Sequence, residues 1–278
     1  MAATAQREEA AFTPMLLSGV KKQARNLPNR LVMHGVEGVG KTSFAQGSHK
    51  PITLMSSGET GLETLITAGQ LEEVAHMPEI HQWLQLLSIL DQLRDEDHDY
   101  RTVVLDTFNG FERLCFEHVC RTQYKGNFGK DGFFAYQEGP NASLTEWRRL
   151  LFKLDQLRER KKGMSVIVLC HSRVNKFSNP EGQDYHRYIP DMHEKVWGLS
   201  HKWADIVLFA NYHQIVVSES KKPTATGKAK GGTQRVAYAE RTAAFDAKNR
   251  HGLSPSFSLG SNHEEAWANF ILEMKGDE

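Results

Sequence analysis

Residues 33–45 read MHGVEGVGKTSFA, and this stretch decides the fold of the chain. Gly35, Gly40, Lys41 and Thr42 match the pattern G-x-x-x-x-G-K-[ST] residue for residue. Glycines allow the backbone to turn its N–H groups inward around phosphate oxygens, and the next helix presents its positive N-terminus to the same anion. The stretch therefore predicts a phosphate-binding loop.

The surroundings of this loop are those of a nucleotide site rather than of a chance glycine-rich turn. An apolar run from Arg30 leads into the loop, and KTSFAQG after it can begin a helix. We expect Lys41 to reach the β- and γ-phosphates of ATP and the hydroxyl of Thr42 to hold Mg²⁺. The predicted nucleotide-binding residues are Gly35, Val36, Glu37, Gly38, Val39, Gly40, Lys41, Thr42 and Ser43.

A phosphate loop needs an acid at the end of a neighbouring buried strand. The run TVVLDT supplies Asp106 at such a position. An apolar run that ends in Asp is common, but its pairing with the loop at an α/β spacing makes Asp106 the predicted second Mg²⁺ ligand, through water.

Composition bounds the class of protein. The chain has 278 residues, of which 40% are hydrophobic and 24% charged, as in ordinary globular proteins. The formal net charge is zero, so any attraction to nucleic acid must come from local patches. The three cysteines form no CxxC pair, and no apolar run is long enough to span a bilayer. We expect a soluble cytoplasmic protein with no membrane partner.

Strands and helices alternate along the chain from Arg30. Apolar runs at 30–35, 51–57, 164–172 and 203–212 predict strands, and 79–96, 110–124 and 143–162 predict helices. Nearly all-apolar strands between helices indicate a mostly parallel sheet covered on both faces, with antiparallel strands near the C-terminus. The predicted fold is an α/β P-loop NTPase core.

The expected organisation has an N-terminal arm at 1–29, a core at 30–252 and a C-terminal tail with a short helix at 253–278. A flexible basic hairpin is expected near 219–235. Within the core, Ser143 followed by Glu146 has the capping-box pattern, so a helix is expected to begin there.

Three further positions carry candidate chemistry. Glu59, just past the second strand, would polarise a water for attack on the γ-phosphate, unless it is a solvated loop carboxylate. His171 ends a buried strand and would sense the γ-phosphate, unless it is a satisfied histidine at a sheet edge. Lys248 and Arg250 share a strand face and would reach a neighbouring subunit's nucleotide as fingers supplied in trans, unless they form a charged surface.

Together these motifs resemble the RecA/DnaB-type ATPases. The segment ITLMSSGETGL (52–62) resembles one in the phage Sak-type RecA-like single-strand annealing proteins, which belong to an AAA-type phage nucleotide-binding family. KNRHG (248–252) is similar to the K-x-R-x-G element that RadA and DnaB relatives use as trans-acting fingers. The resemblance covers residues 30–252. It implies a RecA-like core and ATP hydrolysis at subunit interfaces of a ring, such as a hexamer or heptamer, or of a filament.

By the same resemblance, the expected task is phage DNA recombination or annealing on single-stranded DNA, with a single-strand-binding protein as a possible partner. Ser57 (or Ser56) stands where that group carries an acid before the catalytic Glu. We expect no separate primase or DNA-binding domain of the kind that replicative helicases carry, which favours a stand-alone recombination or annealing ATPase. Two alternatives stay open. One is a DnaB-like helicase or helicase-loader ATPase, and the other is a slow nucleotide-switched module that recruits a partner. A GTPase is disfavoured because no NKxD element is present.

Two segments, 125–141 and 172–195, interleave cations with aromatic rings, which suits single-stranded DNA unless the rings pack the loops against the core. A third basic stretch, 221–235, would track phosphates or stay solvated. The predicted DNA contacts are Lys125, Lys130, Phe133, Arg173, Lys176 and Arg187.

Overall fold

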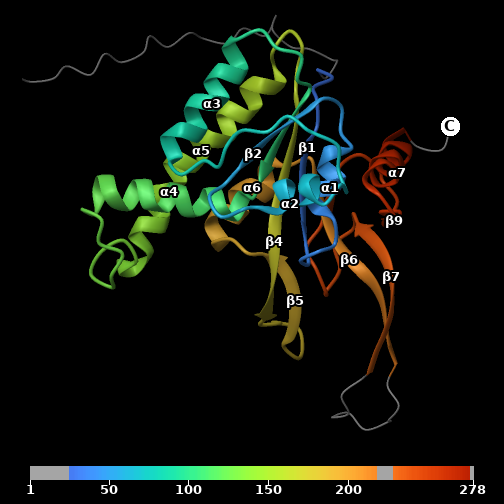
Figure 1. Ribbon diagram of the computed structural model, residues 1–278. Helices are drawn as coiled ribbons and strands as arrows, with labels where there is room; N and C mark the ends of the chain where they lie inside the picture. Colours follow the sequence, from blue (N-terminus) through green and yellow to red (C-terminus); the bar gives the residue numbers. More distant parts are fainter. Residues whose placement is uncertain (1–24, 218–227, 276–278) are drawn as a thin grey trace, which may run out of the picture.

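The computed structural model describes residues 25–217 and 228–275 (Figure 1). The strands are β1 (Arg30–Gly35), β2 (Pro51–Met55), β3 (Thr102–Asp106), β4 (Ser165–Phe177), β5 (Tyr185–Pro190), β6 (Ile206–Val217), β7 (Lys228–Tyr238), β8 (Lys248–Asn249) and β9 (Ser256–Ser258). The α-helices are α1 (Lys41–Gln46), α2 (Gly61–Thr67), α3 (Trp83–Asp95), α4 (Phe108–Gln123), α5 (Glu138–Arg158), α6 (Glu194–Trp203) and α7 (His263–Lys275).

One sheet organises the chain. Its strand order is β2-β3-β4-β1-β6-β7-β9, and the first five of these strands are parallel. β7 and β9 continue the sheet antiparallel, β5 pairs with β4, and β8 pairs with β6. The predicted fold class is confirmed, since this is a mostly parallel α/β sheet with antiparallel strands toward the C-terminus, consistent with a P-loop NTPase core.

Alternate residues of the parallel strands face opposite layers of helices. Val32 and Val168 belong to the core cluster beneath α3, α4, α5 and α6, where the rings of Trp83 and Trp147 stack. Met33 and Leu169 belong to the cluster on the other face, beneath α1 and α7. Figure 1 shows these two layers on either side of the sheet. Burial on both faces explains why the strands are apolar almost throughout.

The predicted start of the third long helix is wrong. Helix α5 begins at Glu138 rather than at Ser143, because Pro140 is tolerated in the first turn and the helix continues through it. The Ser143 hydroxyl lies inside the helix and donates to the Gly139 carbonyl at 2.9 Å. The Glu146 carboxylate accepts a hydrogen bond from the Trp83 indole at 2.9 Å instead of capping the helix.

Two segments are more ordered than the sequence suggests. β4 continues to Phe177 and forms a hairpin with β5, so much of the expected loop at 172–195 is strand. The C-terminal segment joins the core, because β9 pairs with β7 and the ring of Trp267 packs against that of Phe44 on α1. Residues 1–24 of the expected arm and 218–227 of the expected basic hairpin lie outside the described residues. In the part of the chain that is described, no helix is both long and apolar enough to cross a membrane.

Candidate functional site

The candidate site lies where the carboxyl ends of β1, β3 and β4 meet. Parallel strands bring the segments that follow them to one edge of the sheet, which is where α/β proteins bind ligands. A cavity of about 450 Å³ opens there. The side chains around it that carry chemistry are Lys41, Thr42, Glu59, Asp106, His171 and Arg235. The structure thus brings together the predicted residues of the phosphate loop, the second strand, the third strand and the sensor strand.

The phosphate loop has the backbone that its glycines permit. Gly38 and Gly40 adopt positive φ angles of 73° and 92°, which side-chain-bearing residues rarely take. The buried ammonium of Lys41 donates to the carbonyls of Gly35 and Val36, both at 3.0 Å. Burial lowers the pKa of Lys41, although nearby carboxylates oppose the effect. These contacts keep a cation at the centre of the loop.

A hydroxyl and a carboxylate face each other beside this lysine. Thr42 Oγ1 donates to Asp106 Oδ2 at 2.8 Å. Burial raises the pKa of Asp106 to about 6, against the opposing effect of the Thr42 hydrogen bond. Mg²⁺ prefers hard oxygen ligands of this kind and binds through few carboxylates together with substrate phosphates. The donor set therefore fits Mg²⁺ bound with a nucleotide, with Thr42 and Asp106 holding the ion and Lys41 the phosphates.

Glu59 lies between Thr107, the N-cap residue of α4, and His171 on β4. Its Oε1 accepts a hydrogen bond from Thr107 Oγ1 at 2.8 Å and lies 3.3 Å from His171 Nε2. The contact with His171 is the main cause that lowers the pKa of Glu59, and the contact with Glu59 is the main cause that raises the pKa of His171. Each partner thus favours the charged form of the other. A carboxylate held ionised beside a phosphate loop is suited to accept a proton from water.

Arg235 on β7 is a site residue that the sequence analysis did not single out as such. A Cβ on Gly40 would collide with its guanidinium, which donates from Nη2 to the Gly260 carbonyl at 2.9 Å. Its strand pairs it with Tyr212, whose hydroxyl donates to the Gly38 carbonyl at 2.9 Å. Within the described ranges Arg235 has no ion pair with a carboxylate, so a cation anchored by neutral carbonyls faces the phosphate loop.

A family model described as an AAA domain matches residues 27–251. The chain belongs to this AAA-domain family. No curated protein matches the chain. The matched range runs from just before β1 to just after β8 and contains every residue around the cavity. The protein is therefore an AAA-type P-loop ATPase, a nucleotide-binding and nucleotide-hydrolysing domain.

Lys248 and Arg250 of the AAA domain lie away from its own phosphate loop. β8 pairs with Ile206 and Val207 at the amino end of β6, whereas Gly35 pairs with Ala210 further along that strand. Arg250 Nη1 lies 3.6 Å from Asp205 Oδ1, and half of the arginine side chain is exposed. A role toward nucleotide therefore requires a second copy of the chain, and it stays a prediction.

The ammonium of Lys248 is already engaged within the AAA domain. It donates to the carbonyls of His201 and Ala204, both at 2.6 Å, and of Lys202 at 3.2 Å. These groups belong to the last turn of α6 and to its C-cap residue, Ala204, where carbonyls lack partners within the helix. Lys248 therefore caps this helix.

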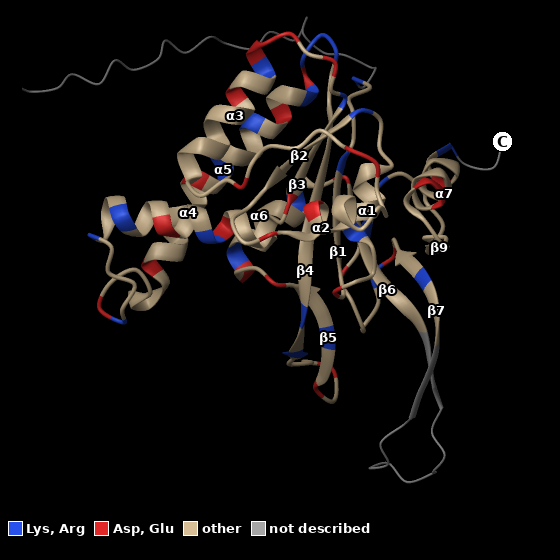
Figure 2. Cartoon of the chain, in the orientation of Figure 1, with Lys and Arg blue, Asp and Glu red and all other residues tan. Residues whose placement is uncertain are grey.

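The predicted DNA contacts divide into exposed and buried side chains. Lys125, Lys130, Arg173 and Lys176 are exposed, on the loop after α4 and on the β4–β5 hairpin, where Figure 2 shows separate blue segments. The prediction of a DNA contact at Phe133 is wrong, because this side chain is fully buried against Val119 and Cys120 and has no face for a base. Arg187 is also buried, and its guanidinium lies inside a second cavity rather than on the surface.

Proposed function

We propose that this AAA domain is a RecA-like ATPase that acts on single-stranded DNA in phage recombination or annealing, with ATP·Mg²⁺ held between subunits of a ring or filament. The observation that carries the proposal is the contact of 3.3 Å between Glu59 and His171, since it joins a candidate general base to β4. The same strand continues into the exposed hairpin that carries Arg173 and Lys176.

The hydrolytic part of the proposal rests on complementary charges. Glu59 accepts a proton from the attacking water, and the Thr107 hydroxyl orients the carboxylate. Lys41 would bind phosphate oxygens, and Thr42 and Asp106 would hold a Mg²⁺ ion, which would neutralise charge on the phosphates. His171 reports the state of the γ-phosphate to β4 through its contact with Glu59.

The DNA-directed part is supported by exposed rings beside exposed cations. Phe128, Phe134 and Tyr136 are exposed on the loop after α4, and Tyr136 is 95% exposed. Lys125 and Lys130 lie on the same loop. Cations that track phosphates and rings that stack on bases are the two elements of sequence-tolerant single-strand binding.

The proposed interface follows from the position of Arg250. Its half-exposed side chain lies at the edge of the sheet opposite to the phosphate loop, so it can serve nucleotide only on a neighbour. An AAA domain that stacks this edge on the next subunit's nucleotide would form a ring or a filament.

The proposal is tested by ATP turnover without DNA, with single-stranded DNA and with duplex DNA, using Lys41→Ala as the blank. We expect single strands, but not duplex, to raise the rate several-fold. Equal rates in all three conditions would exclude the DNA-directed function and favour a nucleotide-switched module. Unwinding of a forked substrate would favour the helicase alternative.

A further inference from the structure

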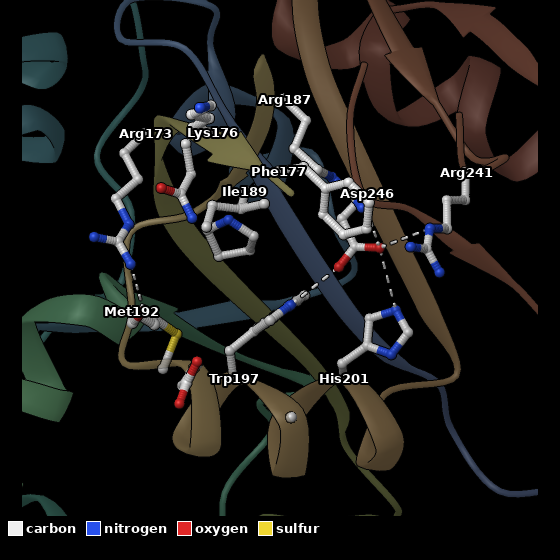
Figure 3. A pocket seen from close by; sticks show the side chains of 14 residues that line it. Arg173, Lys176, Phe177, Arg187, Ile189, Met192, Trp197, His201, Arg241 and Asp246 are labelled. Carbon is white, nitrogen blue, oxygen red and sulfur yellow. Dashed lines mark hydrogen bonds and ion pairs between the residues drawn. The ribbon is translucent and has the colours of Figure 1, made fainter. Parts of the chain in front are cut away.

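A second cavity, of about 420 Å³, lies between the β4–β5 hairpin, α6 and the segment 241–246 (Figure 3). The side chains that carry its chemistry are Phe177, Arg187, Trp197, His201, Arg241 and Asp246. Among the described residues none lines both this cavity and the nucleotide site. The cavity is thus a separate candidate site.

Arg187 is an incompletely satisfied cation inside this cavity. Its side chain is 7% exposed, and its nearest carboxylate oxygen is Asp246 Oδ1, 3.6 Å from Nη2. Its Nε is buried and has no hydrogen-bond partner. The guanidinium lies over the ring of Phe177, 5.7 Å from the ring centroid. Buried polar groups without partners are costly, and a guanidinium whose nearest carboxylate oxygen lies 3.6 Å away keeps the capacity to bind a phosphate oxygen.

Asp246 does not neutralise the cavity on its own. Trp197 Nε1 donates to its Oδ2 at 3.1 Å, while His201 Nε2 and Arg241 Nε lie 3.8 and 3.9 Å from its Oδ1 (Figure 3). Arg187 approaches the same oxygen. One carboxylate therefore faces two guanidinium groups, at distances too long for hydrogen bonds to either.

The rim of the cavity adds further charges of both signs. Lys176 pairs with Asp184 at 2.8 Å, Arg173 pairs with Asp191 at 3.5 Å, and Glu194 also lines the cavity. Lys176 remains 62% exposed, and exposed pairs of this kind contribute little, so its ammonium can exchange Asp184 for another anion.

We propose that this cavity binds one nucleotide unit, with its phosphate on Arg187 and Arg241 and its base against the rings of Phe177 and Trp197. Guanidinium groups are suited to phosphate oxygens, and aromatic rings stack on any base. The two sources of such a ligand are a single-stranded DNA chain and a free nucleotide. The choice of DNA rests on the proposed function.

The cavity is connected to the nucleotide site by His34. His34 Nε2 lies 2.8 Å from the Asp246 carbonyl oxygen, and its Nδ1 lies 2.8 Å from Ser172 Oγ. Burial lowers the pKa of His34 to about 4, so the ring is neutral near pH 7. Because a carbonyl only accepts, Nε2 carries the proton and the Ser172 hydroxyl donates to Nδ1.

This ring joins three segments. His34 immediately precedes the phosphate loop, Ser172 immediately follows His171, and Asp246 lies in the second cavity. A ligand that moves Asp246 would shift the hydrogen bond between His34 and the Asp246 carbonyl. His34 is adjacent to the phosphate loop and contacts Ser172, which is adjacent to His171. We therefore expect ligand binding in the cavity to change ATP affinity, and ATP to change ligand affinity by the same factor.

Binding is measured on the full chain with a fluorescent oligothymidylate, and separately with thymidine monophosphate and inorganic phosphate by tryptophan fluorescence. Arg187→Gln and Lys176→Gln are compared with Lys162→Gln, which removes an exposed lysine from a different part of the surface. We expect Arg187→Gln to weaken oligothymidylate binding about tenfold or more, Lys176→Gln to weaken it less, and Lys162→Gln to leave it unchanged. Trp197→Phe should abolish the fluorescence change.

The outcomes separate this inference from the proposed function. If the wild type binds oligothymidylate but Arg187→Gln and Lys176→Gln bind it equally well, the site is overturned while DNA binding stands. If only the monophosphate binds, and Arg187→Gln weakens it, the site stands and the DNA-directed function fails. Melting curves show whether Arg187→Gln is folded, and Lys176→Gln tests the rim without a buried change.

The connection through His34 is tested with Ser172→Ala, which removes only the hydroxyl. The ATP dissociation constant is measured with and without saturating oligothymidylate. In the wild type we expect a change of several-fold. In Ser172→Ala the ratio of the ATP dissociation constants with and without oligothymidylate should approach one, and oligothymidylate binding should be retained. An unchanged ratio in the variant would overturn the connection.

Discussion

Glu59 and His171 approach each other to 3.3 Å, although 111 residues lie between them in the chain. Both residues line the nucleotide cavity together with Lys41, and the contact favours the ionised form of both partners. The Glu59 side chain is half-buried in the cavity, whereas that of Glu63 on the adjacent helix α2 is exposed. The contrast provides a matched test of the proposed base.

Replacing Glu59 with Gln should lower ATP turnover by about 10²–10⁴-fold, the usual contribution of a general base. ATP affinity should change little, because the amide keeps the size of the side chain and the phosphate contacts of Lys41 remain. Turnover and equilibrium ATP binding are measured for Glu59→Gln and for Glu63→Gln as the control. Equal turnover in the two variants would remove Glu59 from the chemistry.

The stability that the Glu59–His171 pair contributes should depend on pH within a definite window. The pKa of Glu59 is lowered from 4.5, so its contribution is present above pH 4.5 and is lost as pH falls through the lowered value. The pKa of His171 is raised from 6.5, so its contribution is present below pH 6.5 and is lost as pH rises through the raised value.

The Tm difference between wild type and His171→Asn should therefore be largest between pH 4.5 and 6.5. Both side chains are partly exposed, so the pair contributes on the order of 1 kcal/mol or less, about 2–4 °C for a chain of this size. Melting curves from pH 4 to pH 9 measure the difference. A constant difference across this range would show that the pair is not ionic.

Arg235 and Arg250 should behave oppositely when subunits are mixed. Arg235 faces its own phosphate loop, so Arg235→Gln should raise the KM for ATP about tenfold, as the loss of one charged phosphate contact would. A mixture of Arg235→Gln and Lys41→Ala subunits should recover no turnover, because each subunit still lacks one residue of its own site. Arg113→Gln, which removes an exposed arginine on α4, is the control.

A mixture of Arg250→Gln and Lys41→Ala should recover part of the turnover, since the Lys41→Ala subunit supplies Arg250 to an intact loop next to it. Turnover is measured against the mixing ratio. A mixture no more active than its components would contradict the finger supplied in trans.

Lys248 should matter for stability whatever its role between subunits. Lys248→Met leaves three carbonyls at the end of α6 without their donor and should cost about 1–3 kcal/mol of unfolding free energy. Lys202→Met, which changes an exposed lysine on the same turn, should stay within about 0.5 kcal/mol of wild type. Urea unfolding curves compare the two. Equal stabilities would mean that Lys248 does not cap the helix.

The loop after α4 offers a pair of aromatic residues with opposite expectations. Phe133→Ala should destabilise the chain by about 3–5 kcal/mol, because it empties a buried site. Tyr136→Ala should leave stability unchanged and weaken single-strand binding by about 1–3 kcal/mol if the ring stacks on a base. Unfolding curves and oligothymidylate titrations measure both effects. A loss of stability in Tyr136→Ala would contradict this division.

Contiguous motifs were predictable from the sequence because neighbouring residues alone decide them. The phosphate loop needs only its own glycines and the strand before it, and Asp106 needs only a buried strand. The contact between Gly40 and Arg235 depends instead on the register of β6 against β7, a non-local property that no local pattern encodes. The same holds for Lys248, whose three acceptors come from a helix more than forty residues earlier.

Two local sequence patterns gave wrong predictions, each for a physical reason. The Ser143 and Glu146 spacing satisfies a capping box, but a longer helix buries more surface and converts the serine into an interior residue. Phe133 stands in a stretch of rings and cations that looks like a binding loop. One ring of such a stretch must pack against the core to hold the loop, and the sequence does not indicate which one.

The length of β4 gives the molecule a mechanical property. Residues 171, 173, 175 and 177 alternate along one pleated segment, so the side that carries His171 also carries Arg173, Asn175 and Phe177 of the second cavity. An extended strand rises about 3.3 Å per residue and resists stretching along its axis. A displacement at the phosphate end would reach the tip of the hairpin with little loss over roughly 20 Å. Under the proposed function, ATP turnover would therefore move the tip of the hairpin by about as much as it moves His171.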